Sequence, residues 1–412
     1  MNAVFLVLVV VSFLVAAFAE LSGGAGAMEA LSAGLIDAVA GAVPLALGLV
    51  GIMALFLGLM KVAEAGGLLA AVARLLEPAL GRLFPEIPAG HPAMGAMVMN
   101  VAANLLGLGN AATPFGIRAM EHLESLNRHK GTASNAQVLF LAINTAGLTL
   151  LPTKVIALRA ATSSVLPAAI VAPTLIAGLV AALVGVLAAR GLQGVWQPRR
   201  DEDAALPHQA PGPLWPCIAA LAGVLALAAA MLAWGKVLGP WILPSLVVGL
   251  LLYGAAKGVR LYESFVEGAK EGFEVAVRII PYLVAILAAI GMVRASGAMD
   301  LLIRPLGRLT EGLGLPAEAL MMAALRTLSG SGSYGMLAAS LKDPAIGPDS
   351  YLGALLSTLY GSTETTFYVL AVYFGAVQVR RIRHALAVGL LADLAALVTA
   401  VIVCRLLFGG LP

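Results

Sequence analysis

The chain has 412 residues, of which 60% are apolar and only 11% are charged, whereas soluble domains carry roughly 25% charged residues. Apolar runs of about twenty residues, the length that lets a helix cross the hydrocarbon layer, recur along the whole chain. The composition therefore excludes a soluble enzyme and predicts an all-α polytopic membrane protein in a lipid bilayer. The formal net charge of +3 is too small to indicate a nucleic-acid partner.

The membrane helices are predicted, in chain order, at 3–19, 35–60, 135–158, 164–189, 214–235, 240–256, 275–293, 350–377 and 385–408. The first segment ends in an Ala-Phe-Ala triplet like that of a signal peptide, but no Lys or Arg precedes it, so we expect a retained first helix. Two more apolar stretches, 91–116 and 317–341, contain Gly, Asn and Ser and are expected to be broken helices. Cys217 and Cys404 lie in apolar stretches, which favours packing over a disulfide or a metal site.

A polar interval from Arg190 to Pro213 divides the chain near its middle and is predicted to be a linker. We therefore expect a first unit at 1–190, a cytoplasmic linker at 191–213 and a second unit at 214–412. The two halves have the same order of features: a helix with an early proline, an amphipathic Leu/Arg stretch, a glycine-rich broken segment and two long apolar helices. The amphipathic stretches are Leu68–Leu83 and Leu301–Leu309.

Lys and Arg in short loops mark the cytoplasmic side of a membrane protein. On this rule segment 164–189 ends at a cytoplasmic loop, whereas its counterpart 385–408 begins at one, so the halves should be inverted repeats with a cytoplasmic N-terminus. Arg294, Arg304 and Arg308 then fall on the outer side, against the rule, and their stretch is expected to lie in the interface. The loop markers are Arg118, Arg128 and Lys130; Arg190, Arg199 and Arg200; Lys257, Arg260 and Lys270; and Arg380, Arg381 and Arg383.

Inverted repeats with broken helices are typical of secondary transporters, which bind their substrate near the midplane. In the first half, Asn100 and Asn104 share a helix face, and glycines with Pro114 then interrupt the helix. Such groups serve either as interhelical packing or as a ligand or ion site, and we take the second interpretation. The predicted substrate-binding residues of this half are Asn100, Asn104, Asn110, Thr113 and Asn144.

In the second half, serines alternate with glycines after Arg326, which offers hydroxyls and backbone N–H groups to an anionic or hydroxylated ligand. Glu364 is expected at the centre of the helix 350–377, where a carboxylate would carry a coupling proton, ligate a cation or pair with Arg326. Asp393 is a similar acid nearer a helix end, with a structural role nearly as well supported. The predicted substrate-binding residues of this half are Arg326, Ser329, Ser331, Ser333, Thr363 and Glu364.

The sequence offers no sign of a catalytic or metal centre. The five histidines have no metal-ligand spacing, no phosphate-binding loop is present, and no HExxH or Ser/His pairing is visible. We therefore expect no enzyme, no cofactor and no resident metal. A gradient of Na⁺ or H⁺, or a partner, would then drive transport.

At these residues the chain resembles a known family. The segment Asn100–Pro114 is similar to spore maturation protein A, and Arg326–Gly335 with Gly361-Ser-Thr-Glu-Thr-Thr-Phe-Tyr368 is similar to spore maturation protein B. The chain thus resembles a fusion of the two, which are grouped with the nucleoside recognition (Gate) domain. This resemblance implies two Gate-like repeats of a transporter-like fold, but a fold by itself does not identify the substrate.

The preferred hypothesis is a gradient-driven transporter of a small polar solute in the bacterial inner membrane. The solute would be a nucleoside, as the family name implies, or an amino acid or dipeptide, as the Arg and Ser residues suggest. The alternatives are a non-transporting membrane scaffold for envelope or spore maturation, which the short loops disfavour, and an intramembrane enzyme. The sequence leaves homo-oligomerisation open.

Overall fold

The computed structural model describes residues 2–88, 90–194, 212–298, 307 and 310–409. The expected interfacial stretch Leu301–Leu309 with Arg304 and Arg308, and most of the linker with Arg199 and Arg200, lie outside this description. The helices are α1 (Asn2–Leu21), α2 (Ala27–Ala40), α3 (Ala42–Ala65), α4 (Leu68–Leu83), α5 (Pro92–Leu105), α6 (Gly109–Leu126), α7 (Asn135–Ala146), α8 (Thr153–Ala161), η1 (Pro167–Ile170), α9 (Val171–Leu192), α10 (Trp215–Ala256), α11 (Leu261–Ala295), η2 (Glu311–Leu313), α13 (Ala317–Leu328), α14 (Gly330–Lys342), α15 (Tyr351–Ser362), α16 (Thr366–Ala376) and α17 (Ala385–Phe408).

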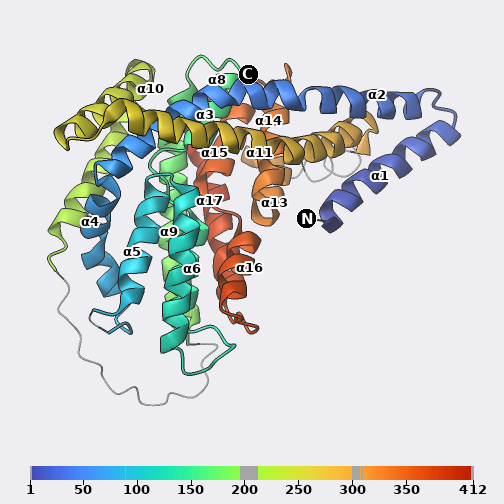
Figure 1. The fold of residues 1–412 in the computed structure, drawn as a ribbon. Helices are drawn as coiled ribbons and strands as arrows, with labels where there is room; N and C mark the ends of the chain where they lie inside the picture. The colour runs from blue at the N-terminus through green and yellow to red at the C-terminus, as the bar shows by residue number, and fades with distance from the viewer. Residues whose placement is uncertain (1, 89, 195–211, 299–306, 308–309, 410–412) are drawn as a thin grey trace.

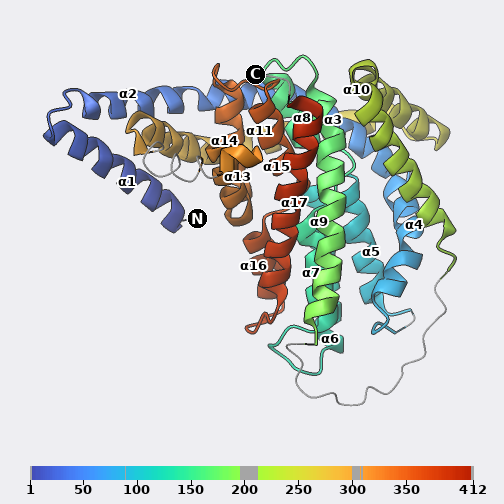
Figure 2. The same ribbon diagram turned by 180° about the vertical axis from the view of Figure 1, so that it is seen from behind.

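The protein is an all-α polytopic membrane protein. Within the described residues, three helical stretches are long and apolar enough to cross a bilayer: Ala27–Ala65, Pro167–Leu192 and Ala385–Phe408. The last two contain α9 and α17, which pack against each other along one face of a bundle, the face seen in Figure 2. Shorter helices from both halves, among them α5, α6, α7, α15 and α16, complete the bundle (Figures 1 and 2).

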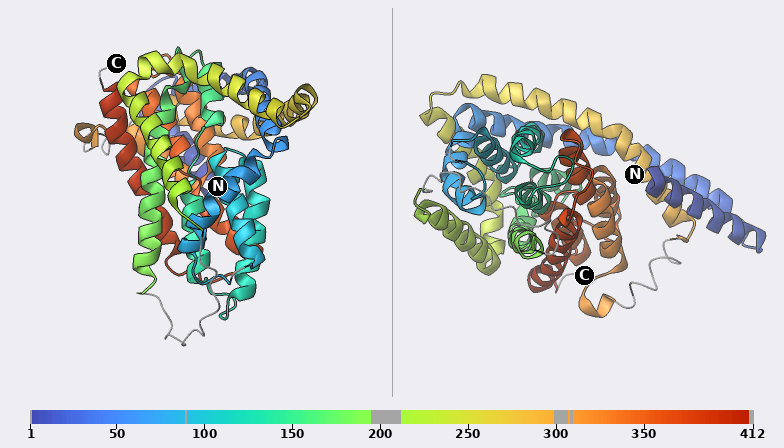
Figure 3. Two further views of the ribbon diagram at one scale, coloured as in Figure 1. Left: turned by 90° about the vertical axis from the view of Figure 1, so that its left-hand side faces the viewer. Right: turned by 90° about the horizontal axis from the view of Figure 1, so that it is seen from below.

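Helices α2, α3 and α11 lie across the upper end of this bundle, and α1 projects beside them (Figures 1 and 3). Close packing of α3 on α11 depends on glycine, because a Cβ on Gly268 would lie 2.4 Å from the Leu57 carbonyl oxygen and one on Gly272 would lie 2.6 Å from the Ala54 Cα. Lys61 of α3 adds an ion pair to Glu271 of α11 at 3.4 Å. The predicted segments 35–60 and 275–293 are thus helical, but they run side by side across the bundle.

Two predicted helices are interrupted, in contrast to expectation. Segment 135–158 is divided into α7 and α8 by a loop that begins at Gly147, which has φ 55°. Segment 350–377 is divided into α15 and α16 by extended residues at Thr363–Thr365. The stretches 91–116 and 317–341 are broken as predicted, between α5 and α6 and between α13 and α14. Each half therefore contributes two broken helices followed by one long helix.

Two basic loops meet at the lower end of the bundle. The backbone N–H groups of Arg380 and Arg381 donate to the Gly131 carbonyl oxygen at 2.9 and 3.0 Å, and Ala133 N–H donates to the Arg381 carbonyl oxygen at 3.0 Å. Helix α9 also ends on this side, whereas the turn between α10 and α11 lies near the upper end (Figure 1). Three of the four predicted basic loops thus share one end of the bundle.

Candidate functional site

The break between α5 and α6 is held by the loop between α7 and α8. Gly107 has φ 76° and ends the continuous helix. Leu150 N–H donates to the Leu105 carbonyl oxygen at 2.9 Å, and the Thr149 hydroxyl donates to the Asn104 carbonyl oxygen at 3.0 Å. Irregular backbone at membrane depth is stable only when protein or water satisfies it. Here donors in the α7–α8 loop pair with the free carbonyl oxygens at the end of α5, so the two breaks of the first half satisfy each other's backbone groups.

The second half uses an arginine for the same purpose. Arg326, at the end of α13, is buried and donates from Nε to the Thr363 carbonyl oxygen at 2.9 Å and from Nη2 to the same oxygen. Its guanidinium group also lies 4.5 Å above the centre of the Tyr360 ring. Arg326 thereby joins the α13–α14 break to the α15–α16 break, and the aromatic face adds a cation–π contact.

Glu364 lies in the α15–α16 break and not in the middle of a helix as the sequence suggested. Its Oε2 is 3.6 Å from Arg326 Nη2, and 47% of its side chain is exposed, compared with 8% for Arg326. The pairing that the sequence left open is present, but it is a loose contact. The Glu364 carboxylate therefore keeps surface on which another group can bind.

The two halves meet through these breaks. Glu364 N–H donates to the Thr145 carbonyl oxygen at 2.9 Å. A Cβ on Gly147 would lie 2.7 Å from Glu364 N, so this approach requires glycine. The four breaks accordingly form one connected series, in which the α7–α8 and α15–α16 breaks touch at the centre.

A network of amide side chains lies beside this junction. Asn104 Nδ2 donates to Asn144 Oδ1 at 3.0 Å, and the Tyr373 hydroxyl donates to the same oxygen at 3.2 Å. Asn100 Nδ2 donates to the Tyr373 hydroxyl at 3.2 Å and to the Ala112 carbonyl oxygen at 2.8 Å. Asn100 Oδ1 is buried without a hydrogen-bond partner. Three of the predicted asparagines thus form one network, centred on a tyrosine that sequence reasoning did not select.

The serines of the second half have different surroundings. The Ser329 hydroxyl accepts from Gly332 N–H at 3.0 Å, which caps α14. The Ser333 hydroxyl is buried and donates to the Ser329 carbonyl oxygen at 2.8 Å. Ser331 is exposed, with its hydroxyl 3.4 Å from that of Ser329. Two of the three hydroxyls are therefore engaged with α14 itself, and Ser331 is the one most open to a ligand.

Asn110 and Thr113 stand at the start of α6. The side chain of Asn110 lies outside the described structure, and Thr113 is half-buried.

Tyr373 is the residue of the network that the sequence did not indicate. It lies in an apolar run of α16, where its phenol group was the one feature of the sequence that could have suggested a polar role. Gly116 of α6 makes room for it, because a Cβ there would lie 2.3 Å from the Tyr373 hydroxyl oxygen.

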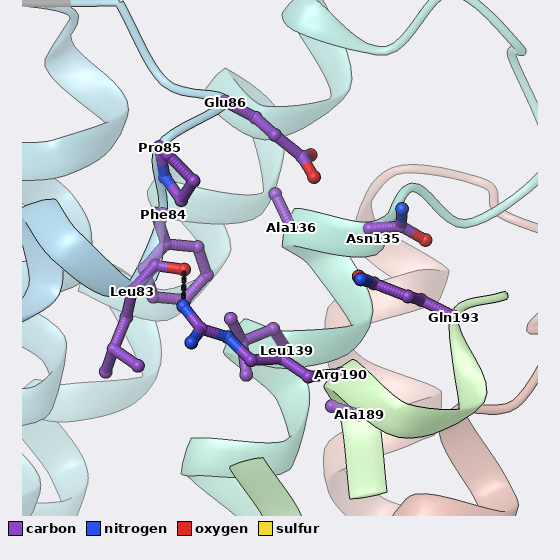
Figure 4. Close-up of a pocket in the computed structure, with 10 residues that line it drawn as sticks. All are labelled: Leu83, Phe84, Pro85, Glu86, Asn135, Ala136, Leu139, Ala189, Arg190 and Gln193. Carbon is purple, nitrogen blue, oxygen red and sulfur yellow. Dashed lines mark hydrogen bonds between the residues drawn. The ribbon is translucent and has the colours of Figure 1, made fainter. Parts of the chain in front are cut away.

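A cavity of about 270 Å³ lies elsewhere, at the lower end of the bundle (Figure 4). The side chain of Arg190 crosses it and donates from Nη2 to the Leu83 carbonyl oxygen at 3.2 Å. None of the predicted site residues lines this cavity, so it is separate from the central junction. Its lining residues are Leu83, Phe84, Pro85, Glu86, Asn135, Ala136, Leu139, Ala189, Arg190 and Gln193.

Comparison with known proteins identifies a family for this chain. The Gate family model, described as nucleoside recognition, matches residues 46–162 and 276–380. Each matched region contains two of the four breaks. No solved structure matches the chain.

Two proteins of Bacillus subtilis (strain 168) are similar to parts of the chain. Spore maturation protein B is 48% identical over 169 residues, which cover 41% of this chain and 94% of that protein. Spore maturation protein A is 42% identical over 162 residues, which cover 39% of this chain and 83% of that protein. The chain therefore belongs to the Gate (nucleoside recognition) family of membrane proteins, as a fused member of the spore maturation protein A and B type.

Proposed function

We propose that the protein is a gradient-driven transporter of a small polar solute in the bacterial inner membrane. The observation that carries this proposal is the junction at which four broken helices, two from each Gate region, meet with charged and amide side chains. Deep polar groups are costly in a bilayer and are kept mainly where they serve function. The short half-helices at the junction would also be able to move relative to the long helices α9 and α17.

The exposed groups at the junction suit a solute with both donors and acceptors. Glu364 offers a carboxylate with 47% of its side chain exposed, and Ser331 adds an exposed hydroxyl. Arg326 supplies positive charge beside them, at 3.6 Å from the carboxylate. An amino acid or dipeptide could pair its ammonium group with Glu364, whereas a nucleoside, which the family description favours, could hydrogen-bond through its ribose or base.

The proposal also includes a topology. The basic loops joined at Gly131 and Arg381 would lie in the cytoplasm under the positive-inside rule, and the N-terminus would share that side. The two Gate regions would be inverted repeats whose relative rocking alternates access to the junction. No chemical step on the solute is required, so we propose no enzymatic activity.

The second candidate is a non-transporting scaffold, which the names of the two spore maturation relatives favour. Thermal-shift binding and proteoliposome uptake of uridine, alanine and dialanine distinguish the two. A transporter should bind and move at least one probe, and Glu364→Gln and Asn104→Ala should weaken both activities by about tenfold, which corresponds to about 1.4 kcal/mol. Absence of binding and of uptake by the wild-type protein would contradict transport and leave the scaffold.

A further inference from the structure

A second carboxyl group, distinct from Glu364, joins two of the helix breaks. Asp393 of α17 accepts a hydrogen bond on Oδ2 from the Thr366 hydroxyl at 2.6 Å, and its Oδ2 is also 3.1 Å from the Thr327 hydroxyl. Thr366 is the first residue of α16, and Thr327 lies in the last turn of α13. Asp393 therefore ties the long helix α17 to both broken helices of the second Gate region.

The position is closely packed. A Cβ on Gly389, one turn before Asp393, would lie 2.6 Å from the Thr366 Cγ2 atom, so glycine lets α16 approach α17 here. The other carboxyl oxygen, Asp393 Oδ1, is buried and has no hydrogen-bond partner. A negative charge on this carboxyl group would thus be left with one oxygen unsatisfied in a medium of low dielectric, which is unfavourable.

Counting hydrogens supports a neutral acid. The Thr327 hydroxyl has one hydrogen but two acceptors within reach, the Ala323 carbonyl oxygen and Asp393 Oδ2, both at 3.1 Å. If Asp393 Oδ2 carries a proton, it donates to Thr327, which donates in turn to Ala323, while Thr366 still donates to Oδ2. Each contact around Oδ2 then has its own hydrogen. If the carboxylate is ionised, the single Thr327 hydrogen must serve both Ala323 and Asp393, so one of these two contacts has no hydrogen.

The neighbouring charges do not replace this proton. Among the described residues, Arg326 is the charged group that acts on Asp393, but it forms no ion pair with it and instead binds the Thr363 carbonyl oxygen and lies beside Glu364. Helix α7, which also packs on α17, has no titratable residue. The other titratable side chains on α17 and on the helices packed against it are Arg190, Glu318, Tyr351, Tyr360, Tyr368, Tyr373, Cys404 and Arg405.

We propose that Asp393 is the proton-carrying residue that couples a proton gradient to movement of the broken helices α13 and α16. Loss of the proton from Oδ2 to water leaves a carboxylate, and Thr327 must then turn its hydrogen from Ala323 toward Asp393. The same event places an uncompensated charge between the two helix ends, which favours their separation and hydration. The coupling role rests on the proposed transport function, whereas the bound proton does not.

Infrared spectroscopy of the purified full-length protein at neutral pH tests the bound proton directly. The C=O stretching band of a protonated carboxylic acid should be present, and Asp393→Asn, which matches the neutral acid in size, should remove it, whereas Glu364→Gln should leave it. Thr327→Val should shift the band, because the carboxyl O–H loses its acceptor, and this variant also serves if Asp393→Asn fails to fold. A band unchanged by both substitutions at position 393 and 327 would overturn the proposal.

Sodium provides a competing outcome. If NaCl, compared with choline chloride, raises the melting temperature of the wild-type protein but not that of Asp393→Asn, the carboxylate holds a cation and the proton proposal is wrong. For the coupling role, Asp393→Asn should lose at least tenfold of pH-gradient-driven uptake of uridine, alanine or dialanine and retain its binding. If the wild-type protein and Asp393→Asn depend equally on the pH gradient, the coupling role is wrong. A wild-type protein that moves no probe would refute the transport function, while the infrared result would still decide whether Asp393 carries the proton.

Discussion

Glu364 and Thr145 are joined by a backbone hydrogen bond of 2.9 Å, although they lie in different Gate regions. Each residue stands where its helix is broken, so the bond satisfies a backbone N–H and a backbone carbonyl group that a continuous helix would have used itself. The contact also holds the Glu364 backbone at the junction between the two Gate regions.

Substitution of Gly147 should disrupt this junction. Gly147→Ala places a Cβ 2.7 Å from Glu364 N at a residue with φ 55°, so both a clash and a left-handed backbone oppose it. Gly131→Ala is a matched control, because Gly131 has φ 79° with nothing within 4 Å and should cost only about 1–2 kcal/mol. Chemical denaturation in detergent should show a larger loss for Gly147→Ala, and equal losses would contradict the close contact.

The Tyr373 hydroxyl should contribute to the stability of the fold. Tyr373→Phe removes a group that Asn100 and Asn144 both contact at 3.2 Å and should lower the free energy of unfolding by about 0.5–1.5 kcal/mol. Tyr368→Phe, on a side chain that is 53% exposed, should be nearly neutral. Equal unfolding energies for the two variants would show that the phenol does not hold the asparagine network.

The ion pair between Arg159 and Asp349 joins a buried cation to a partly exposed acid, so loss of the acid should destabilise the fold. Its N–O distance is 3.1 Å, and the side chains are 2% and 39% exposed. Asp349→Asn leaves a buried guanidinium without its counter-charge and should cost about 1–3 kcal/mol, below the cost of a fully buried pair because carbonyl oxygens of Pro167 and Pro348 still accept from Arg159.

The control for that variant is an ion pair whose arginine is more exposed. Arg294 and Asp343 lie 2.7 Å apart with side chains 33% and 26% exposed, and exposed pairs contribute about 0–1 kcal/mol. Asp343→Asn should therefore be the milder change when both variants are unfolded by denaturant. The reverse order would contradict the assignment of Arg159 as a buried charge.

His384 should make the fold sensitive to mild acid. Burial and the nearby charge of Arg383 lower the pKa of His384 below its usual 6.5, although a bond to the Ala189 carbonyl group opposes this. Below pH 6.5 the unfolded chain therefore binds a proton that the folded chain does not, so stability falls as pH falls until the lowered pKa is reached. Melting temperatures between pH 7.5 and pH 5 should show a smaller acid loss for His384→Gln than for the wild-type protein, and parallel curves would contradict a buried neutral imidazole.

The shared position of two basic loops can be tested by labelling. Lys130→Cys and Arg380→Cys should react with a membrane-impermeant thiol reagent from the same side, because both flank the hydrogen bonds to Gly131. Ala345→Cys, in the loop between α14 and α15 at the upper end (Figure 1), should react from the other side. The parent protein should carry Cys217→Ser and Cys404→Ser, and labelling of positions 130 and 380 from opposite sides would refute the arrangement.

The sequence by itself determined the helical membrane class and two of the four breaks. Hydropathy and the Gly, Asn and Ser residues of 91–116 and 317–341 are local signals, and glycine in particular lowers the local stability of a helix. Asn100, Asn104 and Arg326 were found in the same way, because a polar side chain stands out in an apolar run.

Only the tertiary structure decided that 350–377 is broken at Glu364 and that Tyr373 joins the asparagines. Residues Thr363–Thr365 include neither Gly nor Pro, and their backbone leaves the helix where Arg326 and Thr145 supply replacement partners. Tyr373 and Asn144 are 229 residues apart. Periodicity and spacing describe neighbours within a few turns, so contacts between distant breaks follow only from how the two halves pack.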